Sequence, residues 1–281
     1  MSLELRYAAD LPEGTTRVLI PGGLATPHGT VDRVEVDDAT TTDVIEATTG
    51  QRVVIAAPAG PTLTVIWHAQ SDRVADYPEA MFVPSASRYT RVADELVAEV
   101  ADAVGNTAGL DRARAVACHT AERFTYGHVE TSFHEGLDEV PALGCGVTEG
   151  SCVDINTYFI AALRSVGIEA GYATGFFFPA EKAGACSDGH CWVVTRIDGE
   201  YHEWDIAHHL KIGTRDIIPA LNPKPGRRIA CGHSMGLEVT ELGVRGVKAL
   251  IEPASLVDGR LVWFDEREIR LVDRTRANVG A

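Results

Sequence analysis

The sequence predicts an α+β fold in which a small β-rich part precedes helices and then antiparallel strands. Short runs rich in Val, Ile and Thr, separated by PGG, TTG and PAGP turns, fill the chain from Leu3 to about His68. Such runs are typical of antiparallel strands. Helical patterns follow, and strand-like runs come after Gly167. Because helices and strands occupy separate stretches and do not alternate, the order favours α+β over α/β.

We expect two domains, a β-rich domain over residues 1–85 and a second domain over residues 86–281. A proline-bearing connector, Val74–Ser87, separates them. The chain has 281 residues, 45 % of them apolar, which is enough to bury more than one core. In the second domain the apolar periodicity predicts two helices, over Thr90–Val104 and over Leu110–Tyr126.

The best-patterned helix of the chain begins at Cys152 and ends at Gly167. Its apolar stripe consists of Cys152, Ile155, Tyr158, Phe159, Ala162, Leu163 and Val166. Two strand-like runs follow, EAGYATGFFF and HCWVVTRI, and the dipeptide Asp198-Gly199 predicts a hairpin turn into YHEWD. A second Asp-Gly hairpin near the end of the chain, LVDGRLVWF, is expected to extend a sheet.

Charge and cysteine content restrict the partners and the compartment. The net charge is −15, from 25 Lys and Arg against 40 Asp and Glu, which disfavours nucleic acid and anionic membranes as partners. The stretch MSLELRYAADLPEGTT has no signal-peptide pattern, and no apolar run is long enough to span a bilayer. Six cysteines are too few for a disulfide scaffold. We therefore expect a cytoplasmic protein with reduced thiols.

Cys152 lies where a helix can activate a thiol. A thiolate in the first turn is stabilised by the unpaired N–H groups and by the helix dipole. Gly150 and Ser151 allow a sharp turn and a helix cap, and they leave backbone N–H groups free to face an oxyanion. We expect Cys152 to be a nucleophile, and a buried core thiol is the alternative.

The hairpin GHCWVVTRIDGEYHEWD provides a base and an orienting acceptor for this thiol. If Asp198-Gly199 forms a two-residue turn, His190 and Asp205 lie on one face as diagonal neighbours. An imidazole held by a carboxylate keeps one tautomer and stays cationic beside a thiolate. Cys191 then points to the opposite face, and we expect it in the core.

Together these residues resemble the transglutaminase-like superfamily over Ala113 to Asp205. The matching positions are Gly150, Cys152, Leu163 to Ile168, Gly175, His190, Trp192, Trp204 and Asp205. The resemblance implies a papain-like α+β core with a Cys-His-Asp triad. In it Cys152 is the nucleophile, His190 the general base and acid, and Asp205 the orienting carboxylate. The β-rich N-terminus is similar to the domain that precedes this core in many bacterial members.

The sequence departs from the family in the second oxyanion donor. Family members often carry an aromatic or amide side chain upstream of the cysteine, but the only Trp before Cys152 is Trp67, in the β-rich part. Tyr126 is the candidate instead, and Ser151 is a further candidate contact to substrate or oxyanion. The run HSMGLEVTELG also deviates from a more polar family motif, so the resemblance does not identify the substrate.

A zinc site is the rival interpretation of the same region. The candidate ligands are His202, His208, His209, His233, Cys186, Cys191 and Cys231. Structural zinc usually occurs with spacings such as C-x2-C or H-x3-H, and neither occurs here. We therefore expect no metal and no organic cofactor. Calcium, which some animal members of the family use, has no recognisable loop in this sequence.

The expected function is that of a thiol enzyme that forms an acyl-enzyme on Cys152 from a peptide, protein or small amide or acyl substrate. We expect water to accept the acyl group, because water is always available and its exclusion from an active site demands special architecture. The chain would then be a cysteine protease, peptidase or amidase. Amide-forming acyl transfer to an amine is the alternative. Two hypotheses from other classes are a non-catalytic binding module and a redox role for Cys145 with Cys152. The oligomeric state is not predicted.

Overall fold

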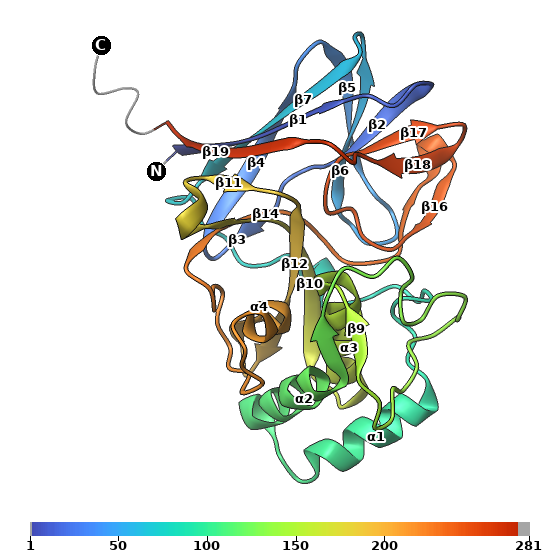
Figure 1. Ribbon diagram of the computed structural model, residues 1–281, viewed down its shortest axis with the longest axis vertical. Coiled ribbons are helices and arrows are strands. Elements are labelled where there is room, and N and C mark those ends of the chain that lie inside the picture. The colour runs from blue at the N-terminus through green and yellow to red at the C-terminus, as the bar shows by residue number, and fades with distance from the viewer. Residues whose placement is uncertain (1, 275–281) are drawn as a thin grey trace. The chain divides into compact units, whose positions relative to one another are not determined.

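A computed structural model of the chain describes residues 2–274 (Figure 1). These residues form two compact units. Unit 1 contains the described residues up to Ala80, Thr174–His190 and the described residues from Pro225 onward, and unit 2 contains Met81–Ala173 and Cys191–Lys224. The fold is α+β, as the sequence predicts, and most of its sheets are antiparallel.

Unit 1 is built mainly from β-strands. Its strands are β1 (Ser2–Asp10), β2 (Thr15–Pro21), β3 (Ala25–Thr26), β4 (Gly29–Val36), β5 (Ala39–Ile45), β6 (Arg52–Pro58), β7 (Thr62–Gln70), β11 (Ala185–Cys186), β14 (Gly226–His233), β15 (Leu237–Val239), β16 (Val244–Val247), β17 (Ala254–Val257), β18 (Arg260–Trp263) and β19 (Glu268–Asp273). Eleven of them form a six-stranded sheet in the order β11-β19-β1-β7-β4-β3 and a five-stranded sheet in the order β18-β17-β2-β6-β5 (Figure 1). Strands β15 and β16 pair with each other.

One face of the six-stranded sheet is apolar because buried apolar side chains alternate along its strands with more exposed ones. In β1 the side chains of Leu3, Leu5 and Tyr7 are buried while their neighbours are not, and they join Trp67 of β7 in one apolar cluster. The hairpin predicted near the end of the chain is confirmed. Strands β17 and β18 pair with each other, and β17 extends the five-stranded sheet through β2.

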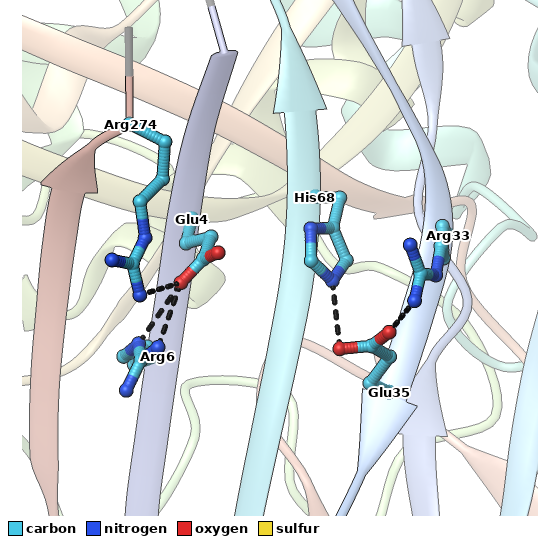
Figure 2. Close-up of polar contacts among 6 residues, drawn as sticks. All are labelled: Glu4, Arg6, Arg33, Glu35, His68 and Arg274. Carbon is cyan, nitrogen blue, oxygen red and sulfur yellow. Dashed lines mark hydrogen bonds and ion pairs between the residues drawn. The ribbon is translucent and has the colours of Figure 1, made fainter. Parts of the chain in front are cut away.

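The other face of the six-stranded sheet carries cross-strand ion pairs. Figure 2 shows two clusters, Glu4 with Arg6 and Arg274, and Glu35 with Arg33 and His68. The hydrogen bond from Arg274, at 2.8 Å, is the main reason why the pKa of Glu4 lies below its usual value. Partly exposed pairs contribute little to stability. The buried apolar face is therefore what holds this sheet in place.

Unit 2 contains the helices. Its elements are α1 (Asp94–Val104), α2 (Gly109–Arg123), β8 (Phe124–Tyr126), β9 (Thr148–Gly150), α3 (Cys152–Ser165), β13 (Glu200–Trp204) and α4 (Ile206–Lys211). Two further strands, β10 (Glu169–Pro179) and β12 (Gly189–Ile197), contribute residues to both units. They belong to a four-stranded sheet in the order β13-β12-β10-β14. Between residues 2 and 274, no helix has the length and apolar character needed to cross a membrane.

The predicted helices are confirmed, with two corrections at their ends. The first begins at Asp94 and not at Thr90, because Val92 forms a bridge with Val140 and Ala93 is extended. The second ends at Arg123, because the last three residues of its pattern form β8 and pair with β9. In both cases a backbone partner far away in the sequence outweighs the helical periodicity.

The compact units are discontinuous in sequence, whereas the two predicted domains, 1–85 and 86–281, are continuous. Whether those two ranges fold independently stays a prediction. The hairpin of β12 and β13 has the predicted register, from Ile197 opposite Glu200 to Val193 opposite Trp204. Its turn residues both have positive φ, as a two-residue turn requires.

Candidate active site

A capping box fixes the N-terminus of α3, where Cys152 is the first helical residue. The Ser151 hydroxyl accepts a hydrogen bond from the Asp154 N–H at 3.4 Å, and Asp154 Oδ2 accepts from the Ser151 N–H at 3.2 Å. The Ser132 hydroxyl donates to Asp154 Oδ1 at 2.5 Å. Caps of this kind stabilise a helix by about 1 kcal/mol. They also fix the position of the Cys152 backbone N–H.

The chain reaches this helix along a short parallel pair of strands. Tyr126 of β8 lies opposite Gly150 of β9, and the Gly127 N–H donates to the Gly150 carbonyl at 3.0 Å. A Cβ atom added at Gly150 would lie 2.9 Å from the ring of Phe124. Only glycine therefore fits where the chain turns from β9 into the helix that carries Cys152.

Cys152 is on the buried side of α3, and the residue is 8 % exposed. Asn156 and Phe159 follow it at i+4 and i+7, so the three side chains share one stripe of the helix. The ring of Phe159 packs on Trp204 of β13 at 6.0 Å. The first turn of α3 thus faces the β12–β13 hairpin and not the solvent.

Cys191 of β12 faces the same stripe. Asn156 Nδ2 donates to the Cys191 carbonyl at 2.9 Å and to its sulfur at 3.4 Å. Asn156 lies one turn after Cys152 on the same stripe of α3, so the two cysteines are neighbours where the helix meets the strand. Burial raises the pKa of Cys191, but its contacts with the neighbouring Cys152 thiol and with Asn156 outweigh that effect, so the pKa lies below its usual value. The prediction that Cys191 is buried is confirmed, and its contact with Cys152 is new.

His190 lies at the start of β12, one residue before Cys191, and it is 5 % exposed. Its ring is 6.4 Å from that of Phe177 on β10. The hairpin has the predicted register. The expectation that His190 and Asp205 are diagonal neighbours is based on this register. The role of His190 as the general base stays a prediction.

Asp205 ends the hairpin and begins α4. It is fully buried, and its Oδ1 accepts a hydrogen bond from the His208 N–H at 2.9 Å. Its Oδ2 lies 2.9 Å from His208 Nδ1, so His208 contacts both carboxylate oxygens. The sequence predicts Asp205 as the partner of His190 and offers His208 only as a candidate zinc ligand. A carboxylate and an imidazole are also metal ligands, and the expectation of a metal-free protein stays a prediction.

The two weaker candidates occupy different positions around Cys152. Ser151 is the helix cap, and its hydroxyl is engaged with Asp154. Tyr126 lies beside Gly150, its hydroxyl is 3.4 Å from His128 Nε2, and Lys211 lies 4.0 Å from its ring centroid. Their roles toward a substrate or an oxyanion stay predictions.

Sequence reasoning missed part of the support for this helix. Asp154 is buried at the third helical position, and the pattern Ser151-x-x-Asp154 could have predicted the capping box. His134 is also buried, with Nδ1 at 3.0 Å from the Ser132 hydroxyl. That hydroxyl joins the loop before the nucleophile to Asp154, and no local pattern indicates this contact.

Comparisons with known proteins point to one family. Residues 95–206 match the description "Transglutaminase-like superfamily". The structure resembles a proposed cysteine protease from Cytophaga hutchinsonii with a TM-score of 0.51 and 15 % identity, over 97 % of this chain and 98 % of that one. This likeness shows a shared fold.

Two more solved structures are similar over smaller parts of their own length. A TGase is similar over 62 % of this chain and 44 % of the TGase chain, with 12 % identity and a TM-score of 0.29. A proposed protease from Parabacteroides distasonis is similar over 70 % of this chain and 39 % of the protease chain, with 13 % identity and a TM-score of 0.29. No curated protein matches the sequence.

Proposed function

We propose that this chain, which belongs to the transglutaminase-like superfamily through residues 95–206, is a thiol enzyme that forms an acyl-enzyme on Cys152. The observation that carries this proposal is the position of Cys152 as the first residue of a helix whose start is fixed by a capping box. The N–H groups and the dipole of that helix favour the thiolate. The same N–H groups suit a negatively charged oxygen on a substrate.

The proposed reaction uses the Cys-His-Asp set of the family. The Cys152 thiolate attacks the carbonyl carbon of an amide or other acyl group, and the backbone N–H of Cys152 donates to the oxyanion. His190 protonates the leaving group, which departs as an amine and leaves a thioester on Cys152. Asp205 keeps the imidazole in the required tautomer. In this scheme His208 holds the buried carboxylate in a fixed orientation.

We propose hydrolysis of the thioester by water, so that the chain acts as a cysteine protease, peptidase or amidase. The substrate would be a peptide, a protein or a small amide, in the cytoplasm. The acyl-enzyme is common to hydrolysis and to amide formation, and the two differ only in which nucleophile reaches the thioester. The test must therefore measure how the thioester partitions between water and an amine.

The test uses pooled peptide amides and small amides in water enriched in oxygen-18, with and without an excess of a primary amine. Hydrolysis is expected to give carboxylic acids that carry one heavy oxygen, and mass spectrometry detects them. Amine adducts as the main product would favour acyl transfer. No product and no acyl adduct on Cys152 from any pool would favour a non-catalytic binding module. The Cys152→Ala variant is the matched control.

A further inference from the structure

A second thiol adjoins the proposed nucleophile. Cys152 is the first residue of α3, and Cys191 is the third residue of β12. Asn156, one helical turn after Cys152 on the same stripe of α3, donates to the Cys191 sulfur at 3.4 Å, and both cysteines lie in unit 2. Cys191 is fully buried, and Cys152 is 8 % exposed. The proposed reaction gives Cys191 no role.

Two separate contacts hold the helix against this strand. Near its start, Asn156 donates to both the carbonyl and the sulfur of Cys191. One turn further, Phe159 packs on Trp204, which lies opposite Val193 of β12. The contact of Asn156 with its sulfur shows that the Cys191 side chain faces α3. The Cys191 sulfur therefore lies against the stripe of α3 that begins at Cys152, beside two contacts that hold the helix to the hairpin.

We propose that Cys152 and Cys191 are an oxidative modification site, and that hydrogen peroxide converts them into a reversible disulfide that switches the enzyme off. The loss of activity rests on the proposed function, because only a catalytic Cys152 gives the bond a consequence. The formation of the bond does not rest on it.

The chemistry balances with one peroxide for each disulfide. The Cys152 thiolate attacks one peroxide oxygen, the O–O bond breaks, and Cys152 becomes a sulfenic acid as hydroxide leaves. The Cys191 thiolate then attacks the sulfenic sulfur and releases a second hydroxide. The two thiol protons convert both hydroxides into water. Two thiols lose two electrons, and the peroxide gains them.

The surroundings of Cys191 suit the second step. Although burial raises its pKa, the contacts of its sulfur with the neighbouring Cys152 thiol and with the Asn156 amide lower it below its usual value. By contrast, burial raises the pKa of Cys186 to about 12 and also raises that of Cys231. Cys145, which the redox hypothesis from the sequence paired with Cys152, is exposed. Cys191 is therefore the better partner for an oxidised Cys152.

The experiment treats the full chain with equimolar hydrogen peroxide and blocks the remaining thiols with N-ethylmaleimide. Non-reducing peptide mapping by mass spectrometry is expected to find the Cys152 and Cys191 peptides joined, with a mass loss of about two hydrogens. Dithiothreitol is expected to reverse the bond. In Cys191→Ser, and equally in Cys191→Ala, peroxide should drive Cys152 to sulfinic acid, which dithiothreitol does not reverse. Circular dichroism checks that these variants fold.

The outcomes separate this proposal from the proposed function. A protein that forms an acyl-enzyme but gives no bond between Cys152 and Cys191 would overturn the disulfide and leave the enzyme intact. A bond between Cys145 and Cys152, with Cys191 still alkylated after unfolding, would also overturn it. A bond between Cys152 and Cys191 in a protein without acyl-enzyme formation would support the modification site and count against catalysis. The Cys145→Ser variant is the control, and it should still form the bond.

Discussion

Cys152→Ala is expected to abolish the initial burst of p-nitrophenol from p-nitrophenyl acetate, an activated acyl ester that tests acyl-enzyme formation without knowledge of the natural substrate. The burst reports the first acylation of the enzyme, and alanine has no nucleophile. Loss of the nucleophile in comparable enzymes lowers the rate by on the order of 10⁴-fold or more. Stopped-flow absorbance measures the burst, and intact mass spectrometry should find one acetyl group on the wild type and none on the variant.

Two controls make this result specific to Cys152. Cys145→Ala removes an exposed thiol and should keep the full burst. Cys191→Ala removes the buried neighbour and should keep acylation, because Cys191 does not react in the proposed reaction. Cys152→Ala deletes one small atom, so its free energy of unfolding should fall by no more than about 1 kcal/mol. A burst of normal size in a folded Cys152→Ala protein would refute nucleophilic catalysis by this residue.

Asp205→Ala should have the second largest effect, and it should act on stability as well as on rate. Asp205 is fully buried, caps α4 and pairs with His208 through its second oxygen. Removal of one partner from a buried pair costs about 3 to 5 kcal/mol, and the lost cap contributes to that cost. We expect a fall of about 3 kcal/mol in the free energy of unfolding, measured by urea denaturation.

Asp205→Asn separates the two effects. The amide oxygen can still accept from the His208 N–H, so most of the stability should return. The negative charge is gone, so the acylation rate should stay low, by on the order of 10⁴-fold as in triads that lose this charge. If Asp205→Asn keeps the wild-type rate, Asp205 is a structural cap and not an orienting carboxylate.

The His208→Asn variant tests whether Asp205 orients the imidazole of His190 or that of His208. The structure places His208 Nδ1 2.9 Å from Asp205 Oδ2, so His208 rivals His190 for the role of the oriented base. If His190 is the base, His208→Asn should lower stability with a modest loss of acylation rate. If the rate falls as far as in Asp205→Asn, His208 carries the proton and His190 does not.

Local patterns predicted the elements that carry the candidate site. The Asp198-Gly199 turn fixed the hairpin register, because a two-residue loop allows one pairing, and the apolar stripe fixed the buried face of α3. Local patterns did not predict secondary structure correctly where a segment pairs with residues far away in the sequence. The end of the second helix became β8 because Phe124 and Tyr126 pair with β9, which lies more than twenty residues later.

The close surroundings of Cys152 depend on tertiary contacts. Cys191 lies near Cys152 because Asn156 and Phe159 fix α3 against the hairpin, and no spacing in the sequence encodes these contacts. The pairing of Asp205 with His208 was accessible in principle, since a helix cap at i and an imidazole at i+3 are neighbours. The family resemblance instead implies His190 as the imidazole that Asp205 orients.

The central claim is that His190 activates the Cys152 thiol. The most direct measurement is the rate of iodoacetamide alkylation of each cysteine as a function of pH, by mass spectrometry, in the wild type and in His190→Ala. We expect Cys152 to react fast at about pH 6, where an ordinary thiol is less than about 1 % ionised, and to lose this advantage in His190→Ala. A Cys152 that titrates as an ordinary thiol, or that reacts equally fast in both proteins, would contradict the claim.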